Sequence, residues 1–288
     1  MHHHPLEATV ERLCAVSQAK YANPYTAIDW PAQLDGDQWC MSPELISIFG
    51  TEAYMHLSAA EQRRLSFYEA VNFFSLNIHG ERALVEGLAR RLYRKGHRAI
   101  SPYLHHFLDE ENKHMTYFGG FCMRYAGKIY PDKKLAFPRT YAPGEEDLLF
   151  FIKILLFEKI VDAYNVHMSK DMRLVPLVRR INLLHHLDEA RHLAFGHLLV
   201  QQIFQEYRQQ WSDDTLHALR DYLSNYLVAT WNEYFNPEVY RDAGLDDPYG
   251  LKEHAFQQPG ARAHRREVTA SCIRYLLATG ILSEEPAL

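Results

Sequence analysis

The sequence predicts an all-α protein built on a bundle of four long helices. Apolar residues recur at helical spacing along most of the chain, and no segment shows the alternation of apolar and polar residues that predicts a strand. Four of the expected helices are long, consecutive and joined by short connections, which favours packing into one bundle. The sequence has no repeat with a period of roughly 20 to 50 residues, so a solenoid is excluded.

Two helices are expected before the bundle. The first runs from Pro5 to about Gln18 and leads into a loop that contains several prolines. The second begins at Ser42-Pro43, because a serine cap followed by proline in the first turn is a common helix start, and it ends at Gly50.

The four bundle helices carry their own start signals. Ser58 and Glu61 have the spacing of a capping box, and Ser101-Pro102 again pairs a cap with proline. A connection with proline and lysine residues, 131–144, separates the second bundle helix from the third. The four expected ranges are 58–96, 101–127, 145–169 and 175–211.

Helices are also expected after the bundle. Ser212 caps a helix that ends before Pro237. A loop rich in glycine, proline and aspartate then leads to a last helix, from Glu267 to about Thr279. The fold class is therefore a four-helix bundle with additional helices at both ends.

Composition argues against two classes of protein. The chain is 47% hydrophobic and 23% charged, and its net charge of −5 without a basic stripe argues against a nucleic-acid binder. The most apolar run, 148–156, contains Lys153 and is too short to cross a bilayer, and no signal peptide is recognisable. We expect one helical domain over residues 1–288, with the bundle core at about 58–211. The cysteines are far apart and are expected to be free thiols in a reducing cytoplasm: Cys14, Cys40, Cys122 and Cys272.

The informative residues are polar side chains on apolar helix faces, because a buried carboxylate without a partner is costly. Glu158 is the clearest case, since it shares a helix face with Phe151, Ile154, Leu155 and Val161. Histidines are also numerous, at 17, although His2–His4 resemble tag residues and are set aside.

The other bundle helices carry similar residues. Glu111 and His114 lie three apart on an apolar face of the second helix, and Glu189 and His192 do so on the fourth. With 21 glutamates and 17 histidines in 288 residues, roughly one such pair is expected by chance, so the pairs alone prove little. Their context is more telling, because each pair follows a lone glutamate on the preceding helix: Glu81 and Glu158.

This arrangement is the pattern of ferritin-like di-iron proteins, in which two helices give one Glu each and two give Glu-x-x-His. Bridging carboxylates and imidazoles suit a pair of iron ions, and the carboxylates offset the positive charge of the metals. Zinc fits less well because a zinc site needs only three or four ligands. Manganese or a mixed metal pair stays open.

His185 lies one turn before Glu189 and adds a seventh candidate ligand. With it, the sequence resembles the p-aminobenzoate N-oxygenase (AurF-like) family, whose di-iron site has a third histidine. The resemblance covers roughly residues 58–200, and His-x-x-x-Glu-x-x-His is its most specific element. It rests on Glu81, Glu111-Asn112-Lys113-His114, Glu158 and His185-His186-Leu187-Asp188-Glu189-Ala190-Arg191-His192.

The resemblance implies an O₂-dependent di-iron monooxygenase that oxidises an amine to a hydroxylamine, nitroso or nitro product. It also implies natural-product biosynthesis, a homodimer, an external electron donor, and a substrate that is either a small molecule or tethered to a carrier. No catalytic side chain beyond the metal ligands is assigned. The expected ligands are Glu81, Glu111 and His114 for one iron and Glu158, His185, Glu189 and His192 for the other, with Glu111 and Glu189 as bridges.

Several points stay open at this level. Glu81 depends on helix register, and Glu69 is the other glutamate on that helix that could replace it. Asp162 and Asp188 each lie one turn from a ligand, Glu158 and His192 respectively, and are candidates to orient the ligating histidines. Alternative functions are another di-iron oxidase such as a hydroxylase or desaturase, a ferritin-type iron-binding protein, and a helical scaffold without metal.

Overall fold

The predicted all-α class is confirmed. The computed structural model describes residues 5–132 and 140–288, and among these no β-strand occurs; a single bridge pairs Trp39 with Leu174. No helix in the described ranges is both long enough and apolar enough to span a membrane. His2–His4 and the middle of the predicted connection 131–144 lie outside the described residues.

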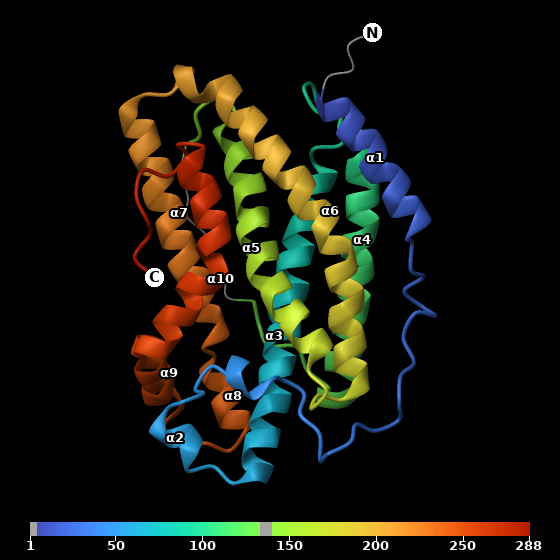
Figure 1. Cartoon of the computed structure of the whole chain (residues 1–288), viewed down its shortest axis with the longest axis vertical. Helices are drawn as coiled ribbons and strands as arrows, with labels where there is room; N and C mark the ends of the chain where they lie inside the picture. Colours follow the sequence, from blue (N-terminus) through green and yellow to red (C-terminus); the bar gives the residue numbers. More distant parts are fainter. Residues whose placement is uncertain (1–4, 133–139) are drawn as a thin grey trace.

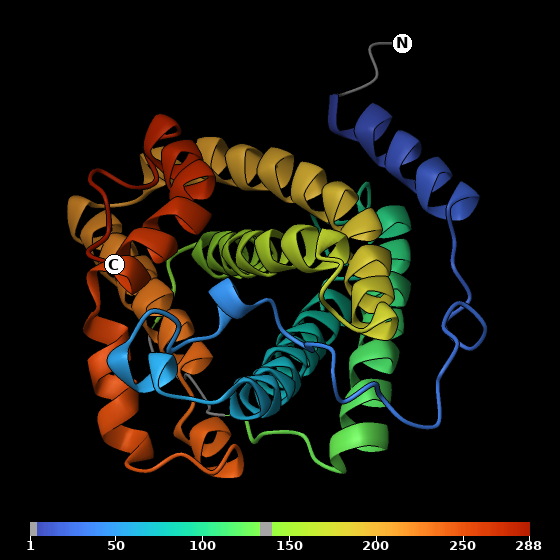
Figure 2. The ribbon, with the colours of Figure 1, turned by 60° about the horizontal axis from the view of Figure 1, so that its bottom comes forward.

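Four long helices form the centre of the molecule (Figure 1). They pack chiefly as two pairs, α3 with α4 and α5 with α6. Helix α1 (Pro5–Ala19) lies against α4 and α6, whereas α7 (Asp213–Tyr234) and α10 (Pro259–Ala278) pack against α5 (Figure 2). The bundle helices are α3 (Ala59–Ala89), α4 (Ser101–Phe121), α5 (Glu145–Lys170) and α6 (Pro176–Tyr207).

Side-chain caps begin several helices, α3 and α7 among them. The predicted box at Ser58 and Glu61 is present in both directions, and Ser212 accepts a hydrogen bond from the backbone N–H of Thr215. A π-helical turn (Cys122–Ala126) extends α4, and Gly127 ends it in the left-handed conformation, with φ of 65°.

In the bundle, the end of α3 and the capping role of Ser101 were predicted wrongly, whereas α4 begins at Ser101 as expected. Helix α3 ends at Ala89 rather than Gly96, and Tyr93 and Gly96 both have positive φ in the irregular segment that follows. Ser101 does not cap α4: its hydroxyl donates to the carbonyl of His97 and accepts from the backbone N–H of Tyr93. Ser101 therefore stabilises the preceding turn.

Prolines caused the other errors. Pro43 opens only one 3₁₀ turn (Pro43–Leu45), and a short helix α2 (Glu52–Met55) follows where Gly50 was expected to end a helix. The segment expected to be a loop contains α8 (Pro237–Asp242) and α9 (Pro248–Gln257), and α10 begins at Pro259 rather than Glu267. In each of these three helices proline occupies the first turn, where its missing N–H costs nothing. The same proline in the sequence also indicates a loop, which is why a loop was predicted.

The apolar core has two parts along the bundle. One contains Phe74, Phe118 and Val161, and the other contains Leu84, Phe107 and Leu155. The polar residues singled out above come from the level between these two clusters. Their surroundings are therefore apolar on both sides, which keeps water away and strengthens electrostatic interactions.

Candidate metal centre

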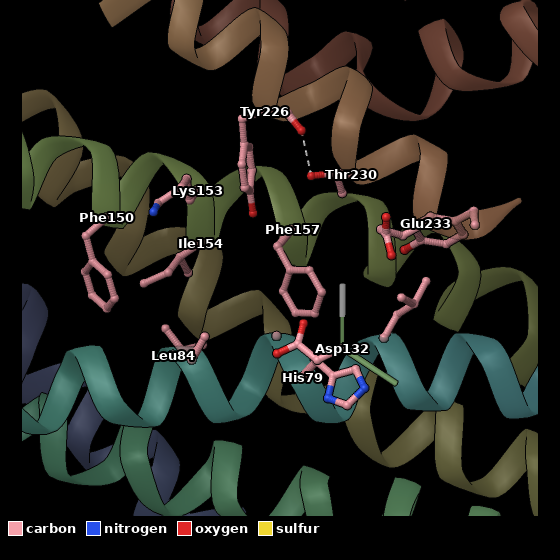
Figure 3. A pocket seen from close by; sticks show the side chains of 14 residues that line it. His79, Leu84, Asp132, Phe150, Lys153, Ile154, Phe157, Tyr226, Thr230 and Glu233 are labelled. Atoms are coloured by element: carbon pink, nitrogen blue, oxygen red, sulfur yellow. Dashed lines mark hydrogen bonds between the residues drawn. The ribbon is translucent and has the colours of Figure 1, made fainter. Parts of the chain in front are cut away.

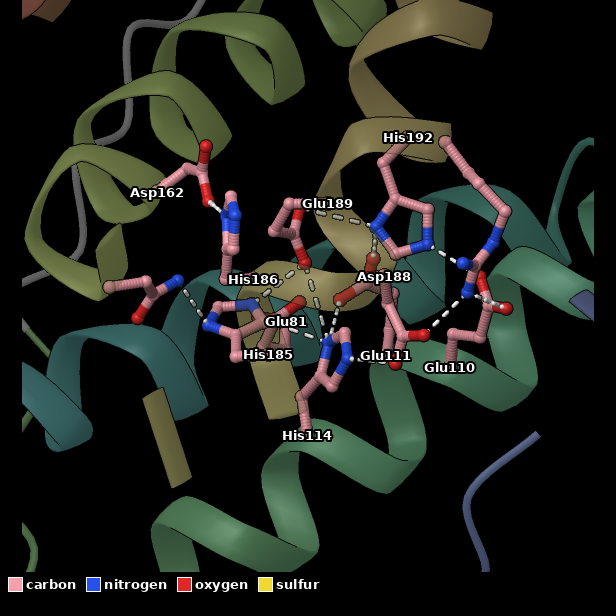
Figure 4. A network of polar contacts seen from close by, with 12 residues as sticks. Glu81, Glu110, Glu111, His114, Asp162, His185, His186, Asp188, Glu189 and His192 are labelled. Carbon is pink, nitrogen blue, oxygen red and sulfur yellow. Dashed lines mark hydrogen bonds and ion pairs between the residues drawn. The ribbon is translucent and has the colours of Figure 1, made fainter. Parts of the chain in front are cut away.

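The seven candidate ligands converge in the middle of the bundle, and Figure 4 labels all of them except Glu158. All seven side chains are fully buried. Six of them fall into overlapping groups whose ligand atoms lie within 4.8 Å of one another, and His192 adjoins these groups through Glu111 and Glu189. The helices contribute Glu81 from α3, Glu111 and His114 from α4, Glu158 from α5, and His185, Glu189 and His192 from α6.

The glutamates of α4 and α6 lie between the histidines of both helices. Nδ1 of His192 is 2.9 Å from Oε1 of Glu111 and 3.2 Å from Oε2 of Glu189. Nδ1 of His114 is 3.2 Å from Glu111 Oε2 and 3.7 Å from Glu189 Oε1. Each glutamate therefore faces one histidine from its own helix and one from the other, which is the position a bridging carboxylate needs.

His185 presents its other ring nitrogen to the same space. Its Nε2 lies 2.8 Å from Oε1 of Glu189 and 3.3 Å from Oε1 of Glu81. Its ring centroid is 4.3 Å from that of His114, and it also groups with Glu158. His185 thus lies close to carboxylates of both expected ligand sets, Glu81 of one and Glu189 of the other.

Two carboxylates orient the histidines of α4 and α6 across the helix interface. Oε2 of Glu110 on α4 is 2.8 Å from Nε2 of His192 on α6, and Oδ2 of Asp188 on α6 is 3.1 Å from Nε2 of His114 on α4. Each contact holds the ring through Nε2–H and turns Nδ1 toward the cluster. Against the effect of burial, the hydrogen bonds with Asp188 and Glu111 raise the pKa of His114 to about 9, and the charges of Glu189 and Glu111 raise that of His192. A metal would therefore displace the Nδ1 proton and leave the Nε2–H tautomer that a ligand requires.

Basic side chains tie these two carboxylates together. The guanidinium of Arg191 donates to both Glu110 and Asp188, and Nζ of Lys113 lies 2.6 Å from Asp188. All four residues are buried. Against the effect of burial, His114 and Lys113 hold the pKa of Asp188 well below its usual range, so Asp188 stays ionised.

Sequence reasoning identified this network only in part. Asp188 was expected to orient a ligand, but its partner is His114 rather than His192, and Asp162 contacts His186 at 2.6 Å instead of any ligand. Glu110, Lys113 and Arg191 were missed. A signal for them exists, because both ligand pairs share the pattern of an acid, Glu, any residue, a base and His: Glu110-Glu111-Asn112-Lys113-His114 and Asp188-Glu189-Ala190-Arg191-His192.

Asn165 on α5 contacts the third histidine. Its side-chain amide lies 2.9 Å from Nδ1 of His185, and both residues are fully buried. A metal on Nε2 would require Nδ1 to carry the proton, with the amide oxygen of Asn165 as acceptor. His185 is therefore positioned by a neutral group, unlike His114 and His192.

The carboxyl groups divide into two kinds. Burial, together with repulsion from Glu111 and Glu158, raises the pKa of Glu81, and burial with repulsion from Glu189 and Glu111 raises that of Glu158. Burial acts on Glu111 in the same direction, but His192 and His114 outweigh it and lower its pKa to about 2. Glu189 is lowered likewise, chiefly by His192 and His185. Without metal, Glu81 and Glu158 therefore hold protons that Glu111 and Glu189 do not.

The donor set fits a pair of divalent cations. No described donor gives a hydrogen bond to the carboxyl oxygens of Glu81 and Glu158, which share protons with Glu111 and Glu189 instead, and Nε2 of His185 has no hydrogen-bond partner among the described residues. Buried polar atoms without partners are costly. Two dications would satisfy these atoms and balance the charge of four ionised glutamates, and the oxygen-rich set with imidazole suits iron or manganese.

A cleft of about 410 Å³ lies beside the centre, between α3, α5 and α7 (Figure 3). Leu84, Ile154 and Phe157 line it, and it borders the α3 and α5 turns that carry Glu81 and Glu158. The ring of Phe157 rests on Gly80, where an added Cβ would collide with it. Gly80 and Phe157 are the sequence neighbours of Glu81 and Glu158, so this contact lies beside two candidate ligands.

Glu69, the alternative to Glu81, does not join the cluster. Its Oε1 accepts hydrogen bonds from the backbone N–H and the hydroxyl of Ser47. It lines a different cavity, near the N-terminal end of α3. The register that placed Glu81 toward the other candidate ligands agrees with the structure.

Comparison with known proteins adds a family. The family model described as "P-aminobenzoate N-oxygenase AurF" matches residues 4–280. Uncharacterized proteins of Mycobacterium bovis and Mycobacterium tuberculosis are each 25% identical over 294 residues, which cover 95% of this chain and 84% of the relative.

Solved structures with a similar fold include variants of an R2-like ligand-binding oxidase. One, with an aerobically reconstituted Mn/Fe cofactor, aligns with a TM-score of 0.53 and 15% identity over 97% of this chain and 94% of the other. A second variant aligns with a TM-score of 0.52 and 16% identity, covering 92% and 93% of the two chains. At this identity the likeness concerns the fold, which is that of ferritin-like R2-type proteins.

Proposed function

We propose, because the chain belongs to the p-aminobenzoate N-oxygenase AurF family, that it is an O₂-dependent N-oxygenase acting on an amine at a pair of iron ions. Membership of this family supports an oxidoreductase. The observation that carries the finer proposal is the buried cluster of four glutamates and three histidines, in which His185 is the residue beyond the basic ferritin-like set.

The proposed ligands divide between two iron ions. Glu81, Glu111 and His114 would hold one, and Glu158, His185, Glu189 and His192 the other. Glu111 and Glu189 would bridge, which is supported by the position of each between histidines of both helices. The contacts of His185 with both Glu81 and Glu189 suit a ligand that crowds the pair on one side.

The reaction has a simple balance. An amine, O₂, two electrons and two protons give a hydroxylamine and water, so an external electron donor is needed. The iron pair, held by the seven ligands, would supply the redox chemistry that activates O₂. Repetition on the hydroxylamine would give nitroso and nitro products.

The protein's own contribution is positioning and exclusion of water. The Glu110–His192 and Asp188–His114 contacts fix two imidazoles in the tautomer that binds metal. Phe107 stacks on His192 at a centroid distance of 4.0 Å, and Phe118 packs edge-on against His185 at 5.0 Å. These rings keep bulk water from the ligands.

The cleft between α3, α5 and α7 is the proposed approach for the amine. Its walls are largely apolar and aromatic, with Tyr226 and Phe157 facing it (Figure 3). Glu81 and Glu158 lie on the helix turns that border the cleft. Their carboxyl oxygens accept no hydrogen bond from the described residues. An amine in this cleft would reach the centre when the Phe157 ring moves from Gly80.

The proposal is tested by turnover with a panel of amines. The protein is loaded with ferrous iron anaerobically, reduced, and exposed to isotopically labelled O₂ with arylamines, free amino acids or carrier-tethered amines. We expect a product with labelled oxygen on nitrogen from at least one amine, detected by mass spectrometry. Oxygen inserted only into C–H bonds would favour another oxidase instead.

His185 separates the two outcomes further. We expect His185→Ala to keep most of its iron, because six ligands remain, but to lose N-oxygenation. If His185→Ala forms the labelled product at the wild-type rate, the residue that distinguishes this proposal has no role in it.

A further inference from the structure

A second cavity, of about 380 Å³, lies away from the metal centre and contains a buried carboxylate. It is lined by segment 41–50, by the N-terminal part of α3, and by residues of α5, α7, α9 and α10. Glu69 and Glu81 are both on α3, and their separation in sequence corresponds to about 18 Å along the helix. The cavity is therefore not part of the candidate metal centre.

Glu69 has no basic partner among the described residues. Its side chain is only 4% exposed, and both of its hydrogen bonds come from Ser47 and end on Oε1. The hydroxyl of Ser47 lies 2.7 Å from the Tyr240 hydroxyl, so the groups around Oε1 of Glu69 are neutral. Oε2 accepts no hydrogen bond from any described donor. Burial raises the pKa of Glu69 to about 7, although Ser47 opposes the shift.

Aromatic rings form the wall that faces this carboxylate's cavity. Tyr164 stacks on Phe73 at a centroid distance of 5.2 Å, and Tyr234 lies 5.2 Å from both Tyr164 and Trp231. All four rings line the cavity and all are at least nine-tenths buried. Stacked aromatic faces beside a carboxylate form an environment that attracts an organic cation.

Two of these rings also have donors without partners. Neither Nε1 of Trp231 nor the hydroxyl of Tyr234 has a hydrogen-bond partner among the described residues. The other charged groups in the lining are Glu44, which is paired with Arg173 and His167, and Arg265, which is held by the carbonyl and ring of Phe256. Arg265 is not among the groups that shift the pKa of Glu69. A ligand with an oxygen atom could accept hydrogen bonds from Trp231 Nε1 and the Tyr234 hydroxyl, and an ammonium group on the same ligand could pair with Glu69.

We propose that this cavity is a binding site for a small aromatic or aliphatic ammonium compound whose charged nitrogen pairs with Glu69. The site is independent of the metals and of the proposed N-oxygenation. His264, which lines the same cavity, does not oppose it, because burial lowers the pKa of the imidazole and keeps it neutral at neutral pH. An anion of the same shape is disfavoured because it would face the carboxylate.

The test uses metal-free full-length protein and three probes of similar shape in isothermal titration calorimetry. Tyramine carries the ammonium, 4-ethylphenol lacks it, and 3-(4-hydroxyphenyl)propanoate replaces it with a carboxylate. We expect tyramine to bind at least about tenfold more tightly than the neutral probe, and the anion to bind most weakly. Equal binding of tyramine and 4-ethylphenol, tightest binding of the anion, or no binding of any probe would overturn the proposal.

Two variants assign the effect to one carboxylate. Glu69→Gln should bring tyramine to the affinity of 4-ethylphenol. Glu44→Gln is the matched control, because Glu44 lines the same cavity but is paired with Arg173 and His167, and it should keep the wild-type preference. Preference that survives in Glu69→Gln contradicts the proposal.

A second measurement covers the case in which Glu69→Gln does not fold. Because Glu69 titrates near neutral pH, pairing it with a cation should release part of a proton from the wild-type protein. Titrations of tyramine at pH 7 in buffers with different heats of ionisation should show this release, whereas 4-ethylphenol should release none. Tyramine binding without proton release would contradict pairing with Glu69.

Discussion

The two halves of the candidate centre are built differently. On α4 and α6, each histidine of the Glu-x-x-His pair contacts an acid from the opposite helix, and Arg191 joins the two acids. On α3 and α5, Glu81 and Glu158 receive no hydrogen bond from any described residue. The α4–α6 half is cross-braced by charge, whereas the α3–α5 half borders a cleft.

This difference suggests a division of labour. The braced half fixes the orientation of its ligands before any metal arrives, because both imidazoles are held through Nε2 and the bridging glutamates are ionised. The other half keeps protonated carboxyl groups whose positions only a metal would fix. Carboxylates that can shift next to a cleft are suited to open a coordination position for substrate.

The largest effect is expected when the braced half loses a bridge. Glu189→Ala should reduce iron content after anaerobic reconstitution to near zero, because Glu189 would contact both metals and three histidines surround it. Glu158→Ala, in the other half, should keep at least one iron per chain. Metal analysis of both variants, with Glu69→Gln as a buried-carboxylate control, tests this. Equal loss in Glu189→Ala and Glu158→Ala would break the comparison.

Removing the brace without touching a ligand should have the next largest effect. In Arg191→Met, Glu110 and Asp188 lose their common partner, and the two histidines lose their fixed orientation. Metal affinity should fall about 10- to 100-fold in a competition titration with a chelator. Arg173→Met, which removes an exposed arginine from another acidic pair, should leave metal affinity unchanged. An unchanged affinity in Arg191→Met would mean that the brace only supports the fold.

Glu69 shows how much stability a buried carboxylate on α3 costs when no histidine contacts it and no metal is proposed to bind it. Burial raises its pKa in the folded protein to about 7, above the ordinary value of about 4.5 for a glutamate. Its favourable contribution to stability is therefore complete below about pH 4.5 and is lost as the pH rises through 7. Relative to Glu69→Gln, the wild type should lose about 2–3 kcal/mol of unfolding free energy between pH 5 and pH 9. Urea unfolding of both proteins across this range measures it, and a constant difference would contradict the raised pKa.

The smallest effect is expected at the cleft. Phe157→Ala should remove the ring that covers Gly80 and change the KM for the amine several-fold, while iron content stays at the wild-type value. Phe150→Ala shortens another aromatic residue of the same cleft, farther from Glu158 along α5, and serves as the control. A Phe157→Ala variant that loses iron would show that the ring supports the centre rather than covers it.

The sequence predicted the bundle and the cluster of candidate ligands for one physical reason. Glu81 and Glu158 are carboxylates at positions whose helical neighbours are apolar, and this mismatch is visible without knowing how helices pack. The family resemblance is confirmed by the family model, which matches residues 4–280. Metal ligation, homodimer formation, the electron donor and the cellular location stay predictions.

The rest depended on contacts between helices. Glu110 and Arg191 brace residues on the opposite helix, and the rotation of α4 against α6 is not written in either helix alone. Asp162 was assigned to the centre by spacing, but it faces His186. Pro248 and Pro259 begin helices in a segment where proline was read as a sign of a loop, because a proline in the first turn looks the same as one in a loop until the following residues pack.

Anomalous diffraction at the iron edge, from crystals of the iron-reconstituted protein, tests the central claim most directly. The account predicts two peaks in the middle of the bundle, one next to Nδ1 of His114 and one next to Nδ1 of His192, with Glu111 and Glu189 between them. A single peak, or peaks at another acidic group such as Glu44, His167 and Asp171, would contradict it.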